Sequence, residues 1–171
     1  MKVVILCGLK IFVMMIGRIR FSRYALLITA VIFLALFVGC FVTLQDRTAF
    51  WVWVSLYVIV LVFALLYAPV CIKADSDFVI MRSPLRSRRI PVRNIESVEL
   101  FRPTMGAKRI IGSGGFMGYW GIFREGDIGR YYAFYGKASD CFLIRLTNGD
   151  KYLLGCENPA AMTAFIKSLI R

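Results

Sequence analysis

The sequence predicts a helical membrane hairpin followed by an all-β domain that a C-terminal helix closes. Three observations support this fold class. Two long stretches near the start, Tyr24–Leu44 and Ala49–Ile72, contain no charged residue. After them the hydrophobic pattern changes to short runs with the two-residue repeat of β-strands. The chain then ends on apolar residues that recur at helical spacing.

Each uncharged stretch is long enough to cross a bilayer as a helix. A helix rises about 1.5 Å per residue, so roughly 20 apolar residues match the hydrocarbon core. The four-residue link Gln45–Thr48 makes the two spans a hairpin. We expect this hairpin to cover residues 24–72, with spans at about 24–44 and 49–71. Residues 73–171 then form the domain behind it.

Basic residues on both flanks predict the orientation of the hairpin. Arg18, Arg20 and Arg23 precede the first span and Lys73 follows the second, whereas the link has no net charge. Because basic flanks stay on the cytoplasmic side, we expect both termini in the cytoplasm. Neither span contains an ionisable Asp, Glu, Lys, Arg or His. Such residues mark ion and proton paths inside membranes, so the pattern indicates an anchor rather than a transporter.

Residues 1–23 form a basic and apolar segment before the first span. Its apolar run, Val3–Leu9, is too short for a span, and no signal-peptide cleavage site follows it. We expect this segment to lie at the membrane interface. The start of translation stays open between Met1 and the pair Met14 and Met15.

A lipid-attachment site at Cys40 is a second alternative. Phe37–Cys40 resembles a lipobox, although Phe37 stands where an aliphatic residue is usual. A second span begins nine residues later, which would be odd in a lipoprotein. An ordinary span is the favoured interpretation.

The composition argues against several function classes. The 171 residues contain no histidine, the commonest acid–base catalyst and metal ligand. The five cysteines form no CxxC pair and no zinc spacing, which favours free thiols in a reducing compartment. Six of the 22 Lys and Arg residues and one of the ten Asp and Glu residues precede residue 72, so the last 100 residues carry a net charge of +7. This charge suits an anionic membrane surface at least as well as nucleic acid.

Short strand patterns follow one another along the last hundred residues, separated by turn residues. We expect five to seven antiparallel strands, drawn from Asp77–Arg82, Arg86–Val92, Glu96–Arg102, Ile128–Tyr135, Cys141–Thr147 and Lys151–Cys156. A closing helix begins after Asn158, which is a good N-cap, with Pro159 at its first position. Its apolar face consists of Met162, Phe165, Ile166 and Leu169.

The dipeptide Asn148-Gly149 predicts a β-hairpin between the last two strands. A two-residue turn would place Cys141 opposite Cys156, where a disulfide is sterically plausible. A three-residue loop, Thr147–Gly149, instead gathers the apolar side chains on one face. That face would contain Phe142, Ile144, Leu146, Tyr152, Leu154 and Cys156. We prefer the three-residue loop because it places more apolar side chains together.

Two runs carry a resemblance to a known family. They are Arg89–Leu100 (RIPVRNIESVEL) and Ile111–Phe123 (IGSGGFMGYWGIF). Together with Leu143–Leu154 and the capped helix after Asn158, they resemble the bacterial pleckstrin-homology-like (PH-like) domain over about residues 74–171. The resemblance implies a bent PH-like sandwich or barrel capped by the C-terminal helix. Members often follow membrane spans, and their molecular role is generally unassigned.

The glycine-rich part of the second run matches no phosphate-binding loop. Met117 stands where a dinucleotide fingerprint needs glycine, and no lysine follows as in a Walker loop. Two interpretations stay open: a tight connection whose aromatics pack the sandwich, or a partly exposed aromatic lip that touches the bilayer or a partner. The candidate interface aromatics are Phe116, Tyr119 and Trp120, with Trp51 and Trp53 at the start of the second span.

Five arginines shortly after the second span are the candidate ligand-binding residues. They are Arg82, Arg86, Arg88, Arg89 and Arg93. Near an anionic leaflet each basic residue contributes about 1 kcal/mol. The resemblance implies that anionic head groups, where they bind, do so at the first strand–strand connection, here near Arg82–Arg89. The alternative is a solvated basic face that mainly sets the topology.

These patterns predict a membrane-anchored recognition module that binds anionic lipid head groups or a protein partner at the cytoplasmic membrane face. The alternative is a non-catalytic structural or accessory subunit of a larger membrane complex. We expect membrane lipids as partners, with another membrane protein as the further option, and no nucleic acid. No carboxylate pair or Cys–His set can be assembled, so we expect no catalytic residue, no metal and no cofactor. The expected location is the bacterial inner (cytoplasmic) membrane.

Overall fold

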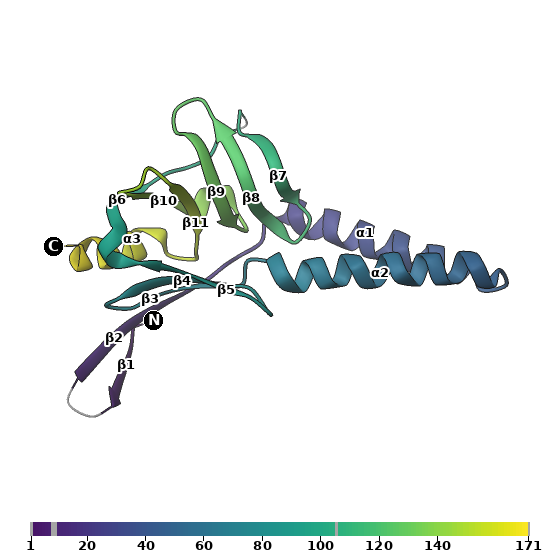
Figure 1. Cartoon of the computed structure of the whole chain (residues 1–171), viewed down its shortest axis with the longest axis horizontal. Helices are drawn as coiled ribbons and strands as arrows, with labels where there is room; N and C mark the ends of the chain where they lie inside the picture. Colours follow the sequence, from purple (N-terminus) through teal and green to yellow (C-terminus); the bar gives the residue numbers. More distant parts are fainter. Residues whose placement is uncertain (1, 8–9, 105, 171) are drawn as a thin grey trace.

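The protein consists of a long helical pair that projects from two packed β-sheets (Figure 1). The structure, a computed structural model, describes residues 2–7, 10–104 and 106–170, with side chains from residue 14 on. Helix α1 runs over Arg23–Val42 and helix α2 over Arg47–Tyr67. Both are long and apolar enough to cross a membrane. The two helices pack closely near the link, where a Cβ on Gly39 would lie 2.6 Å from the Trp53 ring.

Local capping explains where the helices begin. The Ser22 hydroxyl accepts a hydrogen bond from the Ala25 N–H, and the Asp46 carboxylate accepts bonds from the N–H groups of Thr48 and Ala49. The prediction that the second span runs to residue 71 is wrong at its end. Helix α2 stops at Tyr67 because Pro69 disfavours helical backbone in the residue before it.

The strands form one five-stranded and one six-stranded sheet. The first has the order β1-β2-β3-β4-β5, and its strands are Lys2–Cys7, Lys10–Arg18, Cys71–Ala74, Phe78–Arg82 and Ser87–Pro91. The second has the order β6-β10-β11-β9-β8-β7, and in chain order its strands β6 to β11 are Ile95–Leu100, Lys108–Gly115, Gly118–Glu125, Gly129–Tyr135, Cys141–Leu146 and Lys151–Gly155. Two short 3₁₀ turns, η1 (Val92–Asn94) and η2 (Ala138–Asp140), lie between strands. Figure 1 shows the two sheets stacked to the left of the helical pair.

The segment before α1 belongs to the first sheet, which corrects the expectation that it lies as an apolar segment at the membrane interface. Strand β2 pairs antiparallel with β3, with Met15 opposite Ala74 and Arg18 opposite Cys71. Met15 is buried in the core. The first sheet therefore combines strands that precede α1 in the sequence with strands that follow α2. Met1, one of the two candidate start positions, lies outside the described residues.

The main apolar core lies between the sheets and under the closing helix α3, Pro159–Leu169. Asn158 caps α3 by accepting a hydrogen bond from the Ala161 N–H, as predicted. Met162 and Ile166 of α3 are fully buried. The strands contribute most of the remaining core: Ile72, Val79, Met81, Ile90, Val98, Phe142, Ile144 and Leu154. The predicted sandwich with its C-terminal helix is confirmed.

The β10–β11 hairpin has the predicted three-residue loop. Arg145 pairs with Lys151, and the N–H of Leu146 donates to the Asp150 carbonyl, so residues 147–149 form the loop. Cys141 consequently faces Gly155 and not Cys156, and both thiols are free and buried. The prediction of a wholly antiparallel domain is wrong, since β9 and β11 pair in parallel.

Candidate functional site

The turn of the β4–β5 hairpin contacts the C-terminal end of α2. The N–H of Leu85 donates to the Leu65 carbonyl at 3.0 Å, and the N–H of Ser83 donates to the Arg86 carbonyl at 2.7 Å. Strand β4 is held to the helix exit as well, because the Val70 N–H donates to the Arg82 carbonyl. Arg82, Leu85 and Arg86 therefore lie where the helical pair meets the sheets.

A row of residues at this junction crosses the first sheet. Arg18 is opposite Cys71, Cys71 is opposite Arg82, and Arg82 is opposite Ser87. Residues directly opposite in antiparallel strands share a face, and neighbouring strands lie about 4.8 Å apart. Arg18 and Arg82 are therefore on the same outer face, roughly 10 Å apart.

Three further arginines surround the same junction. Arg86 lies in the β4–β5 turn, Arg23 opens α1, and Arg20 forms an exposed ion pair with Glu157. We call Arg18, Arg20, Arg23, Arg82 and Arg86 the arginine collar. All five are exposed. The collar combines two of the predicted ligand residues with the three basic residues that were assigned only to orientation.

The structure separates the five predicted arginines. Arg88 points between the sheets, with its guanidinium 5.0 Å from the ring centre of Tyr132 and 5.8 Å from that of Tyr152. Arg89 lies on the opposite face of β5, one residue further from the helices than Arg88. Arg93 lies in η1, beyond the Phe78–Pro91 pair at the end of the β4–β5 hairpin opposite its turn. Only Arg82 and Arg86 reach the junction, where Arg86 also sits 5.6 Å from the Tyr67 ring.

The glycine-rich run forms the β7–β8 hairpin, which bends at two facing glycines. Gly112 and Gly121 are directly opposite and have φ values of +120° and +116°. A Cβ at either position would lie within 2.2 Å of a carbonyl oxygen on the other strand. Only glycine combines this backbone with so close an approach. The bend directs the hairpin turn, Phe116–Met117, toward the helices (Figure 1).

The tip of this hairpin packs on the helical pair. The N–H of Met117 donates to the Thr29 hydroxyl of α1 at 2.8 Å. The Phe116 ring lies 5.9 Å from that of Phe33, and the Trp120 ring stacks on Tyr67 at 4.9 Å. The run is therefore a brace between the second sheet and the helices, which neither of the two open interpretations describes fully.

The remaining candidate aromatics lie apart from one another. Trp51 is exposed near the link, and Trp53 packs against Gly39 of the neighbouring helix. Tyr119 stacks on Tyr135 at 4.8 Å, in a second apolar cluster on the outer face of the six-stranded sheet. Burial raises the pKa of the Tyr119 hydroxyl. Tyr119 and Trp53 thus serve packing within the protein.

A cleft lies beside the contact between the helical pair and the β7–β8 hairpin. Its volume is about 340 Å³, and its walls are Ile32, Val60, Phe63, Arg109, Gly112, Ser113, Phe116 and Trp120. Sequence reasoning missed Arg109, Thr29 and Tyr67 as site residues. No local signal marks them, because the contacts of Thr29 and Tyr67 join segments that are distant in the chain.

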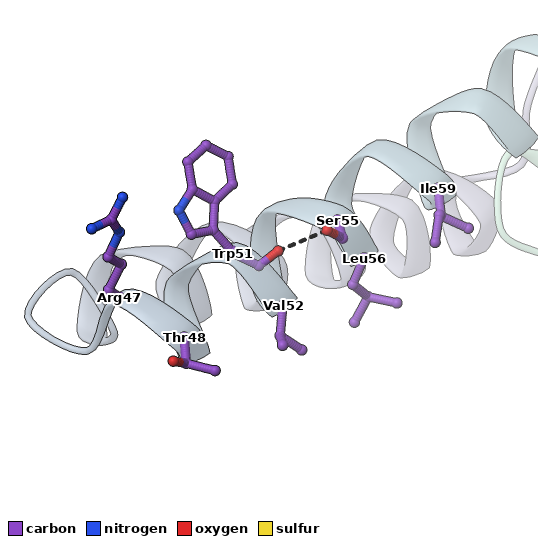
Figure 2. Close-up of a pocket in the computed structure, with 7 residues that line it drawn as sticks. All are labelled: Arg47, Thr48, Trp51, Val52, Ser55, Leu56 and Ile59. Carbon is purple, nitrogen blue, oxygen red and sulfur yellow. Dashed lines mark hydrogen bonds between the residues drawn. The ribbon is translucent and has the colours of Figure 1, made fainter.

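A shallow, open hollow runs along α2 near the link (Figure 2). It measures about 730 Å³ and is lined by side chains from successive turns of one helix, among them Trp51, Leu56 and Ile59. Ser55 donates its hydroxyl to the Trp51 carbonyl at 2.8 Å, so this polar group is satisfied within the helix. The surface has the character of a helix face that lipid would cover.

The buried carboxylate of Glu125 has a structural role. Glu125, 3% exposed, accepts hydrogen bonds from the N–H and hydroxyl of Thr104 and from the Tyr131 hydroxyl, which attaches the loop after β6 to β8. Burial raises the pKa of the Cys141 thiol, and it raises that of Cys156 to about 11. Thiols held protonated are poor nucleophiles. Among the side chains that the structure describes, from residue 14 on, no three metal-ligating groups come together.

The chain matches the family model described as Bacterial PH domain over residues 71–170, more than half of its length. No curated protein and no solved structure matches it. PH-like domains are generally non-catalytic binding modules, and the sandwich with its C-terminal helix agrees with this fold. The chain belongs to the bacterial PH domain family.

Proposed function

We propose that the protein is a membrane-anchored recognition module whose PH-like domain binds anionic lipid head groups at the cytoplasmic face of a bacterial inner membrane. The arginine collar is the observation that carries the proposal. Its five exposed arginines surround the inner ends of two helices that are long and apolar enough to span. Basic residues near an anionic leaflet contribute about 1 kcal/mol each, so several together favour anionic lipid around the junction.

The experiment compares lipid enrichment around full-length protein variants. The full chain is required, because removing everything before residue 73 would delete β2 and half of β3. The protein is reconstituted into phosphatidylcholine containing a minor fraction of phosphatidylglycerol and extracted with its surrounding lipid in polymer discs. We expect phosphatidylglycerol to be enriched around the wild type, and the enrichment to fall in high salt.

The collar variant carries Arg18→Gln, Arg82→Gln and Arg86→Gln. A matched control carries Arg93→Gln, Arg124→Gln and Arg130→Gln, which removes the same charge from η1 and from the end of β8 and β9 opposite the β7–β8 turn. We expect the collar variant to lose most of the enrichment and the control to keep it. Equal losses in the two variants would contradict a role for the collar.

Orientation is tested with new cysteines at exposed turns. Cys141 and Cys156 are unsuitable reporters, because both are buried whichever side they face. In a variant with alanine at the other three cysteines, an impermeant thiol reagent added to intact cells should label Gln45→Cys in the link. It should leave Asn148→Cys in the β10–β11 turn unlabelled. The reverse pattern would place the domain outside the cell.

A second candidate function is a structural subunit of a larger membrane complex. It is favoured by β7, the outer strand of the six-stranded sheet, where Ile110 and Ile111 are 52% and 66% exposed. Exposed edge strands are templates for pairing with another chain. Crosslinking of the full-length protein in its own membrane tests this candidate, with crosslinks from β7 to another protein as the supporting result.

A further inference from the structure

The cleft beside the β7–β8 hairpin lies at a depth where lipid surrounds the helices. Helices α1 and α2 have 20 and 21 residues, or about 30 Å each at 1.5 Å per residue, which equals the hydrocarbon thickness. Ile32 is nine residues inside the first residue of α1, and Val60 is seven residues before the end of α2. These positions are about 14 Å and 10 Å along the helices. The cleft therefore opens toward the inner leaflet.

Arg109 supplies a positive charge at this cleft. Arg109 takes part in neither of the ion pairs found between the described side chains, which join Arg20 to Glu157 and Arg145 to Glu99. Its guanidinium extends along β7 toward the hairpin tip, since a Cβ on Gly114 would lie 3.7 Å from Arg109 Nη1. An arginine near the hydrocarbon region requires an anionic partner or access to the interface.

The cleft walls combine this charge with an apolar surface. Ile32, Val60 and Phe63 line the helix side, and Phe116 and Trp120 line the hairpin side. The Ser113 hydroxyl is already satisfied, because it donates to the Phe116 carbonyl at 2.8 Å. One cationic group above an apolar channel matches the chemistry of a phospholipid, which joins a phosphate to acyl chains.

We propose that this cleft binds one anionic glycerophospholipid of the surrounding bilayer, with its phosphate at Arg109 and one acyl chain between Val60 and Trp120. The inference rests on the membrane anchoring proposed above, and it does not depend on the arginine collar. The volume of about 340 Å³ is at the low end for small-molecule sites. It accommodates part of a lipid, and the rest of the molecule stays in the bilayer.

Fluorescence of Trp120 provides a direct readout, because this side chain lines the cleft. The full-length protein carries Trp51→Phe and Trp53→Phe, so Trp120 alone reports. It is reconstituted into two kinds of phosphatidylcholine bilayer. One contains a small fraction of brominated phosphatidylglycerol, and the other contains the same fraction of brominated phosphatidylcholine. The brominated acyl chains quench tryptophan on contact. We expect at least twofold stronger quenching by the brominated phosphatidylglycerol.

The variant Arg109→Gln should remove this preference, so that both lipids quench equally. Its matched control, Lys108→Gln, removes the same charge from the neighbouring residue of β7 and should keep the preference. Val60→Phe narrows the cleft and leaves Arg109 in place, so it should reduce quenching by both lipids. This last variant does not depend on how well Arg109→Gln folds.

Three results would overturn the inference. If the two lipids quench Trp120 equally in the protein that retains Arg109, the cleft does not select anionic lipid. A preference that survives Arg109→Gln would place the phosphate elsewhere. No quenching by either lipid would mean that protein, such as a strand added at β7, covers the cleft.

The collar variant separates this site from the proposed function. With Arg18→Gln, Arg82→Gln and Arg86→Gln, the Trp120 preference should persist, and its loss would contradict the assignment to Arg109. If wild-type protein shows no general enrichment of phosphatidylglycerol but Trp120 keeps its preference, the collar proposal fails and the cleft stands.

Discussion

Two hairpins from different sheets contact the helical pair near the ends of α1 and α2 that face the sheets, and their chemistry differs. The β4–β5 turn attaches to α2 through the Leu85 N–H and presents Arg82 and Arg86. The β7–β8 turn attaches to α1 through the Met117 N–H, and its neighbours are glycines and aromatic rings. Each turn is thus tied to one helix by a backbone N–H.

At the junction, the β4–β5 hairpin contributes charged side chains, and the β7–β8 hairpin contributes close packing. Arginines on an exposed turn interact over several ångströms and tolerate small changes in geometry, but salt screens them. The β7–β8 hairpin depends on close contact at Gly112 and Gly121, which salt does not affect and one added methyl group disrupts. We therefore expect the two hairpins to respond to different perturbations.

The largest effect is expected at the bend of the β7–β8 hairpin. Gly121→Ala places a Cβ 2.2 Å from the Ile111 carbonyl oxygen at a φ of +116°. We expect a loss of about 4 kcal/mol in the free energy of unfolding, from backbone strain and overpacking together. Denaturant unfolding of the purified protein measures it. Gly126→Ala, in the turn after β8, meets no atom within 4 Å and should be nearly neutral; equal effects would disprove the requirement for the bend.

Neither hairpin turn contains a group that titrates between pH 7 and 11. High pH should therefore act on the sandwich behind both hairpins. Burial raises the pKa of Cys156 from about 9 in the unfolded chain to about 11. The folded state holds the proton more tightly, so this contribution is complete below pH 9 and is lost as the pH rises toward 11. The loss is about 3 kcal/mol. Unfolding measured from pH 7 to 11 should show a smaller slope in Cys156→Ala; an unchanged slope would exclude this thiol.

A smaller effect is expected when the β7–β8 turn loses its bond to α1. Thr29→Val keeps the shape of the side chain and removes the hydroxyl that accepts the Met117 N–H. We expect a loss of about 1–2 kcal/mol, since an unpaired N–H remains in a packed contact. Hydrogen exchange at the Met117 amide should accelerate in this variant. Thr29→Ser retains the acceptor and should retain the protection; fast exchange in both variants would show that the hydroxyl is not the anchor.

The smallest effect is expected on β5, where two neighbouring arginines face opposite ways. Arg88→Gln removes a guanidinium from the faces of Tyr132 and Tyr152. Such cation–π contacts contribute roughly 0.5–1 kcal/mol each, so we expect a loss of about 1 kcal/mol. Arg89→Gln, on the outer face, should leave unfolding unchanged. Identical results for the two variants would show that the tyrosine contacts add no stability.

The elements with strong local signals could be predicted from the sequence. Uncharged stretches marked α1 and α2, and Asn158-Pro159 marked the start of α3. The β10–β11 register followed from alternation on either side of Asn148-Gly149. Each of these signals lies within about twenty neighbouring residues, so the physics that produces it is visible in one segment.

The candidate site could be predicted only in part. Arg82 and Arg86 were identified from their density, but the density also included Arg88, which points between the sheets, and Arg89 and Arg93, which lie further from the helices. Strand direction decides which arginines reach the helices. The N-terminal arginines join them because β2 pairs with β3 across an insertion of two helices, and no local pattern encodes that pairing.

The sequence by itself determined the two apolar helices, the closing helix and most of the strands between them, because burial and backbone preferences act over short distances. The PH family could also be recognised from short motifs, and the family match confirms it. Only the tertiary structure decided that the glycine-rich run braces the helices. Its bend comes from Gly112 meeting Gly121 across two strands, and its docking comes from Met117 meeting Thr29, which is 88 residues away. Contacts of this range depend on the whole chain being folded, so the junction and its cleft become visible only in three dimensions.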